Sequence, residues 1–373
     1  MNENILNFDE KVVFGLRGLY EQYGYSQYKM SKFEEYELYV RNKDFLISDS
    51  IITFTDTNGR LMALKPDVTL SIIKNTALGE GNVQKVYYNE NVYRVSKGTH
   101  TFKEIMQVGL ECIGDIDDYC IGEVLLLAAR SLCSISPNCV LDISHLGIIS
   151  ELLDSCELSL GARKTVLNCI SEKNVHELSR ICFEEKVDEQ KTEVLKQLTE
   201  LYGKPDEVLP KLRSLNEFMT ASTALKQLEN IFSMLADEGL GDMLRIDFSV
   251  VNDISYYNGI VFKGFVEGVP TSILSGGQYD RLLKKMHRDA GAIGFAVYLD
   301  TLERMDTNEE RYDTDMVLIY DASSDMNTLH RAIKKLQKDG ERVMALKKIP
   351  EKLKYRRAFI LKGNEVAPIE NDA

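Results

Sequence analysis

The 373-residue chain contains no tryptophan, only five histidines and no long apolar run. Its longest aliphatic stretch, Val124 to Ala129, is far shorter than the roughly 20 residues needed to cross a membrane. Residues 1–4 lack the basic start and the apolar run of a signal peptide. With 44% hydrophobic and 28% charged residues, the composition is that of a globular protein, which we expect in the cytoplasm.

Motifs that bind metals or nucleotides are also missing. The seven cysteines form no C-x-x-C pair, and none is followed by a histidine at zinc-ligand spacing, so we expect reduced thiols and no metal site. Gly79-Glu80-Gly81 and Gly239-Leu240-Gly241 do not extend to a dinucleotide fingerprint, and there is no P-loop. The sequence therefore predicts no cofactor.

Charge is unevenly distributed along the chain. The net charge is −13, but residues 331–362 hold 12 Lys and Arg against 3 Asp and Glu, so this segment carries +9 and the remainder −22. The simplest interpretation of the basic segment is a solvated helix and hairpin. A remnant of a tRNA-binding domain and a docking surface for an acidic partner are the alternatives.

The hydrophobic pattern predicts strands, then helices, then strands again. A helix at 12–23 precedes a hairpin, 51–64, whose Asn58-Gly59 turn is typical of type I′. Helical stripes fill residues 151–239, and Gly276-Gly277 is expected to lead into a helix at 279–286. This order favours an antiparallel α+β core, formed by 1–150 and 240–308, with a helical insertion at 151–239 and a small α/β unit at 313–373.

One predicted strand, 104–114, is the most informative. Its even positions, from Met106 to Cys112, are all apolar, whereas Gln107 and Glu111 share the other face with Gly109 between them. Side chains alternate across a strand, so the two polar groups point the same way. We interpret this face as the floor of a cavity; a solvated sheet face is the alternative.

Five segments, in chain order, resemble motifs of the histidyl-tRNA synthetases. They are K-P-D-V-T at 65–69, the motif 2 strands at 86–94 and 106–111, Y-Y-N-G with V-F at 256–262, S-G-G-Q-Y-D at 275–280, and G-F-A of motif 3 at 294–296. The resemblance covers about residues 10–305, apart from the helical insertion. It implies a class II aminoacyl-tRNA synthetase-like antiparallel sheet flanked by helices, and a dimer that pairs near residues 25–39.

The resemblance also implies a histidine pocket. In that family, the positions of Asp67, Thr69 and Gln107 receive the ammonium group, and those of Glu111, Tyr257 and Tyr279 surround the imidazole. The chemistry is consistent, because carboxylate and amide oxygens accept hydrogen bonds from an ammonium group and a carboxylate accepts one from an imidazole N–H. Arg94 matches the motif 2 arginine, which contacts the α-phosphate and the carboxylate.

The adenylation machinery departs from the family pattern. Asn252 and Thr301 stand where the synthetases have arginines, Tyr298 replaces a glycine and is expected to crowd the adenine site, and residues 95–99 differ from the usual motif 2 loop. Adenylate formation depends on fixed cations around phosphorus. We therefore expect no aminoacylation activity and no catalytic residues. We also do not expect the protein to bind tRNA.

A retained amino-acid pocket beside a degraded adenylation site resembles the regulatory subunits of ATP phosphoribosyltransferase. This resemblance implies a noncatalytic partner of the short catalytic subunit in the first step of histidine biosynthesis, with histidine as the feedback effector. The effector site could be the synthetase-like pocket or the subunit interface. The alternatives are a divergent active histidyl-tRNA synthetase and a stand-alone amino-acid-binding protein.

Overall fold

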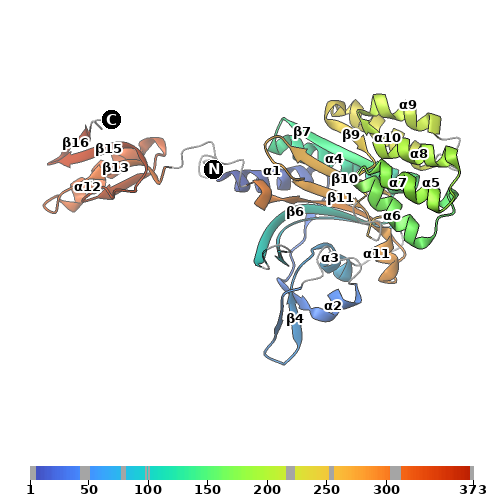
Figure 1. Cartoon of the computed structure of the whole chain (residues 1–373). Coiled ribbons are helices and arrows are strands. Elements are labelled where there is room, and N and C mark those ends of the chain that lie inside the picture. Colours follow the sequence, from blue (N-terminus) through green and yellow to red (C-terminus); the bar gives the residue numbers. More distant parts are fainter. Residues whose placement is uncertain are drawn as a thin grey trace. The chain divides into compact units, whose positions relative to one another are not determined.

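The computed structural model describes residues 6–42, 51–76, 81–96, 99, 101–215, 223–251, 256–302 and 312–369. The chain divides into two compact units, residues 1–305 and 306–373, and each combines helices with a sheet (Figure 1). In the described ranges, no helix is both long and apolar enough to cross a membrane.

A nine-stranded sheet forms the centre of the larger unit. In spatial order its strands are β1 (Ser26–Gln27), β5 (Val83–Val95), β6 (Phe102–Gly114), β12 (Gly291–Tyr298), β11 (Leu274–Gln278), β10 (Ile260–Val266), β7 (Cys139–His145), β9 (Leu244–Asp247) and β8 (Tyr202–Gly203). Neighbouring strands are antiparallel except in the pairs β1–β5 and β7–β9. The predicted antiparallel α+β core is therefore confirmed.

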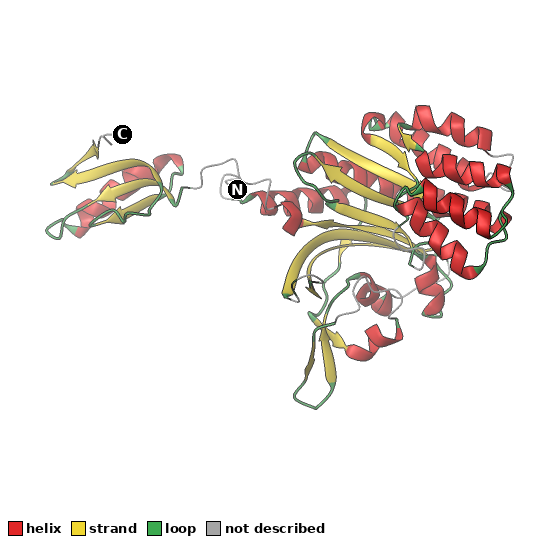
Figure 2. Ribbon diagram, viewed as in Figure 1, coloured by secondary structure: helices red, strands yellow, loops and turns green. Residues whose placement is uncertain are grey.

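Two long helices, α1 (Phe8–Gln22) and α4 (Asp118–Ile135), pack against one face of this sheet (Figure 2). The helix α1 buries Val12, Leu16 and Tyr20, which recur every four residues along one stripe. At its start, Asn7 N–H donates a hydrogen bond to the Glu10 carboxylate. The even positions of β6 join the core under these helices, as their alternation predicted.

The opposite face of the sheet carries a second, smaller layer. It consists of the helices α2 (Tyr36–Arg41), α3 (Thr69–Asn75) and α11 (Asp280–Lys285) and of a three-stranded antiparallel sheet, β2 (Phe33–Glu35), β4 (Leu61–Leu64) and β3 (Thr53–Thr55). A separate apolar cluster joins this layer to β5 and β12. The polar positions of β6 face this side, between the two layers.

A stack of helices lies beside the β7–β9–β8 edge of the large sheet (Figure 1). It comprises α5 (Leu146–Ser155), α6 (Leu160–Ser171), α7 (Val175–Glu184), α8 (Glu189–Glu200), α9 (Pro205–Leu215) and α10 (Thr223–Asp237), and a short 3-10 helix (Gly241–Met243) returns the chain to β9. The apolar stripes predicted here are buried, so these helices are held together by packing.

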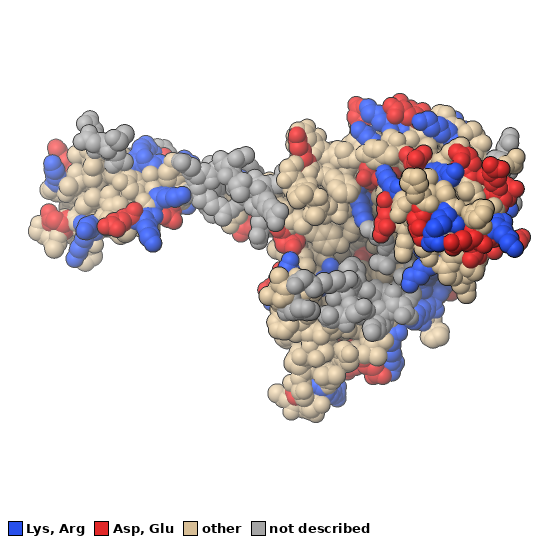
Figure 3. Space-filling view, viewed as in Figure 1, with Lys and Arg blue, Asp and Glu red and all other residues tan. Residues whose placement is uncertain are grey.

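The C-terminal unit is a four-stranded sheet with one helix. The strand β13 (Thr314–Ile319) lies between β14 (Val343–Leu346) and β15 (Tyr355–Lys362), parallel to both, and β16 (Glu365–Ile369) pairs antiparallel with β15. The helix α12 (Met326–Leu336) connects β13 to β14. Figure 3 shows Lys and Arg side chains on the visible surface of this unit, and Arg331, Lys334 and Lys335 of α12 are exposed.

The hairpin turn differs from the predicted type I′. Of Asn58 and Gly59, only Gly59 has a positive φ, of 80°. The Asp56 carboxylate accepts hydrogen bonds from the backbone N–H groups of Asn58 and Arg60, both at 2.8 Å. The Asp56 side chain thus stabilises a longer loop, in which only one residue needs the left-handed conformation.

The double glycine lies inside a strand. Gly276 and Gly277 belong to β11, and the helix that follows, α11, spans Asp280–Lys285, close to the predicted 279–286. A Cβ atom on Gly276 would lie 2.4 Å from the Gly294 carbonyl oxygen, and one on Gly277 would lie 2.7 Å from the Tyr257 ring. These glycines let neighbouring groups approach the sheet closely, which is a common reason for glycine in a strand.

The strand β10 begins at Ile260, because Tyr256 and Tyr257, which precede it, turn inward toward the second layer. After β12 the chain forms a 3-10 turn at residues 299–302.

Candidate ligand-binding site

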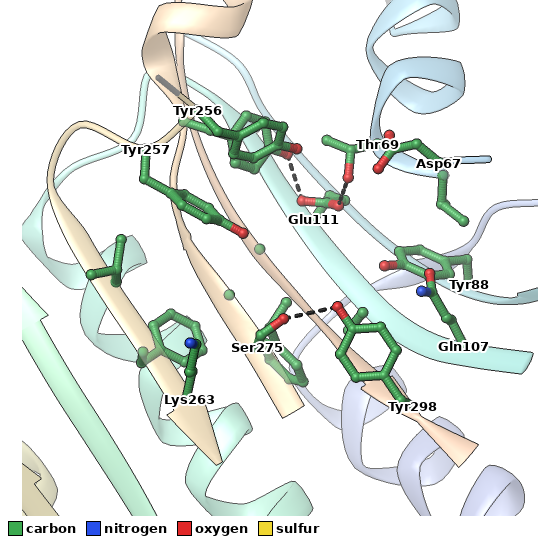
Figure 4. Close-up of a pocket in the computed structure, with 18 of the residues that line it drawn as sticks. Asp67, Thr69, Tyr88, Gln107, Glu111, Tyr256, Tyr257, Lys263, Ser275 and Tyr298 are labelled. Carbon is green, nitrogen blue, oxygen red and sulfur yellow. Dashed lines mark hydrogen bonds between the residues drawn. The ribbon is translucent and has the colours of Figure 1, made fainter. Parts of the chain in front are cut away.

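A cavity of about 200 Å³ lies between the large sheet and the second layer. All seven residues predicted for the histidine pocket contribute to its wall: Asp67, Thr69, Arg94, Gln107, Glu111, Tyr257 and Tyr279. Figure 4 labels five of the seven, and their side chains converge from β6 (Gln107 and Glu111), from the start of α3 (Asp67 and Thr69) and from the segment before β10 (Tyr257). The odd face of β6 is therefore a cavity floor, since Gln107 and Glu111 are only 4% and 2% exposed.

Glu111 is the buried acid at the centre of the cavity. One carboxylate oxygen accepts a hydrogen bond from the Tyr279 hydroxyl at 2.5 Å, and the other accepts one from the Thr69 hydroxyl at 2.9 Å. Burial raises the pKa of Glu111 to about 8, although both hydroxyls oppose the shift. Gly294 provides the space, because a Cβ atom there would lie 1.8 Å from the carboxylate.

Asp67 supplies a second acid at the entrance to α3. Its carboxylate accepts a hydrogen bond from Leu70 N–H at 2.9 Å, at the N-terminus of the helix. Burial raises the pKa of Asp67, while that hydrogen bond and the nearby charge of Arg94 lower it. The Arg94 guanidinium is held beside Asp67, because its Nε donates to the Pro66 carbonyl oxygen at 3.0 Å.

Lys65, the first residue of the K-P-D-V-T segment, does not line the cavity. It is completely buried, and its Nζ donates a hydrogen bond to the Glu90 carboxylate at 2.9 Å. Burial lowers the pKa of Lys65, whereas Glu90 raises it. The buried ion pair links β5 to the chain just before Asp67 and so helps to position the acid.

Three tyrosines form the aromatic wall of the cavity. The rings of Tyr256 and Tyr257 meet edge to face, with centroids 4.6 Å apart, and Tyr279 packs 5.7 Å from Tyr256. Tyr88 closes the floor above Gly109, where a Cβ atom would lie 2.4 Å from its hydroxyl oxygen. A planar ring bound here could pack against the tyrosine rings and form a hydrogen bond with the carboxylate in the same enclosed space.

At the motif 3 positions, the structure shows what the side chains that depart from the synthetase pattern do. The Tyr298 side chain lies in the cavity wall, and its hydroxyl forms a 2.9 Å hydrogen bond with the Ser275 hydroxyl (Figure 4). The Thr301 hydroxyl donates to the Tyr298 carbonyl oxygen at 2.6 Å and so carries no cation toward the cavity. Asn252 and part of the 95–99 loop lie outside the described residues.

The sequence analysis did not assign several residues that line the cavity, namely Tyr88, Tyr256, Lys263 and Ser275. Lys263 is separated by one residue from Val261, another wall residue, so the alternation of β10 was a usable signal. The wall thus combines two carboxylates, the cations Arg94 and Lys263, and several hydroxyls. Its described residues include no cysteine or histidine, and the arrangement is suited to binding a small polar molecule that has both donors and acceptors.

The described residues contain no group of three or more His, Cys, Asp or Glu side chains that could hold a metal ion.

The family profile described as histidyl-tRNA synthetase matches residues 6–302. The chain is 30% identical over 336 residues to an ATP phosphoribosyltransferase regulatory subunit of Clostridium kluyveri, covering 87% of this chain and 85% of the relative.

Two solved structures share the fold. One is an ATP phosphoribosyltransferase regulatory subunit/histidyl-tRNA synthetase from Bacillus halodurans, with a TM-score of 0.74 at 24% identity, covering 91% of this chain and 88% of that one. The other is a chain of the ATP phosphoribosyl transferase (HisG:HisZ) complex from Thermotoga maritima, with a TM-score of 0.63 at 20% identity, covering 80% and 98%.

Proposed function

The chain belongs to the histidyl-tRNA synthetase family and, within it, to the regulatory subunits of ATP phosphoribosyltransferase, and on this premise we propose its function. It acts in the cytoplasm as the noncatalytic subunit that the short catalytic subunit requires for activity, in the first step of histidine biosynthesis. The observation that carries the proposal is the cavity itself. All seven residues assigned to the amino-acid side line this cavity, whereas Tyr298 and Thr301 stand at the glycine and arginine positions of the adenylation side.

In this role the cavity binds histidine as the feedback effector. The ammonium group is held by Asp67, Thr69 and Gln107. The imidazole ring lies beside Tyr257 and is oriented by Glu111 and Tyr279. The pairing of these groups with Asp67 and Glu111 is favourable, because burial raises the pKa of both acids, and an ammonium group and an imidazole N–H beside them stabilise their ionised forms. Burial raises the pKa of Asp67 and the charge of Arg94 opposes that shift, so Arg94 favours the ionised form of Asp67 beside the bound amino acid.

Mixing this protein with the short catalytic subunit tests the proposal. We expect the formation of phosphoribosyl-ATP to increase about 10-fold or more on mixing, and added histidine to suppress that increase, since an effector that binds one state more tightly shifts the population toward it. An unchanged rate in the mixture would contradict the regulatory role.

The second candidate function, a divergent histidyl-tRNA synthetase, has a separate test. Histidine-dependent exchange between ATP and pyrophosphate by this protein alone would support it. We expect no exchange, because the hydroxyl of Thr301 cannot replace an arginine at a phosphorus centre, and because the Tyr298 ring occupies space that the family keeps open with a glycine.

Self-association is part of the proposal, through the region around residues 25–39. Of the apolar residues in this region, Tyr28, Tyr36 and Leu38 pack against the apolar cluster of the second layer, whereas Phe33 is 49% exposed. The Phe33 ring stacks edge to face on exposed Phe54, with centroids 5.3 Å apart. We expect Phe33→Asp to lower the molecular mass measured by light scattering to that of a monomer, and Phe102→Asp, at another exposed aromatic residue, to leave it unchanged.

A further inference from the structure

Two cysteines outside the cavity lie with their sulfur atoms in contact. Cys133, in the last turn of α4, and Cys139, the first residue of β7, have their Sγ atoms 3.8 Å apart. The helix and the strand that carry them pack against each other (Figure 1). Both side chains are free thiols, and neither lines the ligand cavity.

The connection between the two cysteines is short and held in place. It consists of residues 134–138. Ser136 ends the helix, since its N–H donates to the Leu132 carbonyl oxygen at 2.9 Å, and its hydroxyl accepts a hydrogen bond from Asn138 N–H at 3.3 Å. The Asn138 side chain donates in turn to the Glu267 carboxylate at 2.6 Å, just after β10. The backbone therefore keeps the two thiols close together.

A third sulfur atom directs Cys133 toward its neighbour. The Cys133 thiol donates to the Met243 Sδ at 3.4 Å. Met243 is buried at the end of the 3-10 helix that precedes β9. This contact draws the Cys133 sulfur toward the protein, where Cys139 also lies, so the two thiols need no large rearrangement to meet.

The two thiols differ in their access to solvent. All seven cysteines belong to the described ranges, and Cys133 is the only one of them that is exposed, whereas Cys139 is buried. Burial and the adjacent Cys133 raise the pKa of Cys139, which therefore stays protonated. Because a thiolate is the reactive form of cysteine, a dissolved oxidant reacts first at the exposed sulfur. Any other pair of cysteines in the chain lacks such an exposed member.

We propose that Cys133 and Cys139 form a redox-sensitive dithiol, which hydrogen peroxide converts to a disulfide. Cys133, having released its proton, attacks one peroxide oxygen and the O–O bond breaks. The products are a sulfenic acid on Cys133 and hydroxide, which takes up the released proton to give water. The Cys139 sulfur then attacks the Cys133 sulfur, the S–O bond breaks, and the departing hydroxide takes the Cys139 proton as a second water.

The two sulfurs give up two electrons in this sequence, and the peroxide takes them up. They have to approach from 3.8 Å to about 2.0 Å, the length of a disulfide bond. Cys133 lies at a helix end, where the backbone yields most easily. In a reducing compartment the pair returns to thiols, so the bond forms only under oxidative stress. This site does not depend on histidine binding.

Counting thiols in the full-length protein tests the proposal. The protein is treated with a small excess of hydrogen peroxide, unfolded and labelled with iodoacetamide, and its mass is measured. The reduced chain takes up seven labels. We expect two fewer after peroxide, and seven again when dithiothreitol follows the peroxide. Cleavage after Arg130 and before Asp142 releases the peptide 131–141, which contains only these two cysteines. Its mass should fall by about 2 Da, because two hydrogens are lost.

Three variants assign the roles within the pair. Cys133→Ser should lose no label on peroxide treatment. Cys139→Ser leaves the sulfenic acid without a partner, so a 1,3-diketone should trap it on Cys133 at least about 5-fold more than in the unaltered protein. Cys120→Ser is the matched control, because Cys120 lies at the other end of α4 and is partly exposed. It should lose two labels, as the unaltered protein does.

Three results would overturn the dithiol. They are retention of all seven labels after peroxide, a disulfide between other cysteines, and a gain of oxygen on the peptide 131–141 of the unaltered protein in place of the lost hydrogens.

Discussion

Replacing Glu111 with glutamine is expected to weaken histidine binding about 30-fold or more and, at the same time, to stabilise the empty protein above neutral pH. The loss of affinity follows from removing a carboxyl group that can ionise as the imidazole group binds, since a hydrogen bond to a charged group contributes about 1.5–3 kcal/mol. Glutamine keeps the shape of the side chain. Its amide oxygen can still accept from one of the two hydroxyls, those of Tyr279 and Thr69, that now bond the carboxylate.

The gain in stability has a defined pH window. The pKa of Glu111 is about 8 in the folded protein, against 4.5 for an unperturbed glutamate. Between these values the unfolded chain releases its proton first, so the free energy of unfolding falls as the pH rises, by up to about 1.4 kcal/mol per pH unit. Glu111→Gln removes this dependence. It should therefore be more stable than the unaltered protein by a few kcal/mol at pH 8, and equally stable near pH 4.5.

Denaturant unfolding at pH 4.5, 6 and 8, together with calorimetric titration of histidine, measures both effects. Glu104→Gln is the matched control, because Glu104 lies on the same strand but is exposed. It should change neither quantity. Equal stability of Glu111→Gln and the unaltered protein at pH 8 would show that burial does not hold the proton on Glu111.

Replacing Gly294 with alanine is expected to cost at least about 3 kcal/mol of folding free energy and to abolish histidine binding. The added Cβ atom would lie 1.8 Å from the Glu111 carboxylate and 2.5 Å from the Leu110 backbone carbonyl oxygen. The carboxylate can rotate, but the carbonyl belongs to the ladder that pairs β12 with β6. The strands would have to separate, and the cavity floor would move with them.

A second glycine provides the contrast. Gly15 lies in the interior of α1, is exposed, and has no atom within 4 Å of an added Cβ. Gly15→Ala should therefore stabilise the protein by about 0.5–1 kcal/mol, because alanine is the better helix former. Urea unfolding of the two variants should give shifts of opposite sign. A destabilisation below about 1 kcal/mol for Gly294→Ala would mean that the two strands are not tightly packed at Glu111.

Local sequence patterns were sufficient to predict the elements that matter most to the site. The alternation of β6 placed Gln107 and Glu111 on one face because the period of two is a property of the backbone itself. The stripe of α1 and those of the helical stack depend equally on local spacing. The turn after β3 was misjudged because the Asp56 side chain competes with the Asn58-Gly59 preference, and a dipeptide rule does not include that contact.

Whether the polar face of β6 borders solvent or a cavity was decided only by the tertiary structure. Alternation alone leaves a solvated face and a cavity floor equally possible, and the difference comes from Tyr279 and Gly294, which lie far along the chain on other elements. The hydrogen bond between the Ser275 and Tyr298 hydroxyls depends in the same way on how β11 pairs with β12. Periodicity within a segment is set by backbone geometry, which each stretch of sequence carries by itself. The closeness of distant segments is set by how the sheet pairs and what covers it, and that is a property of the whole chain.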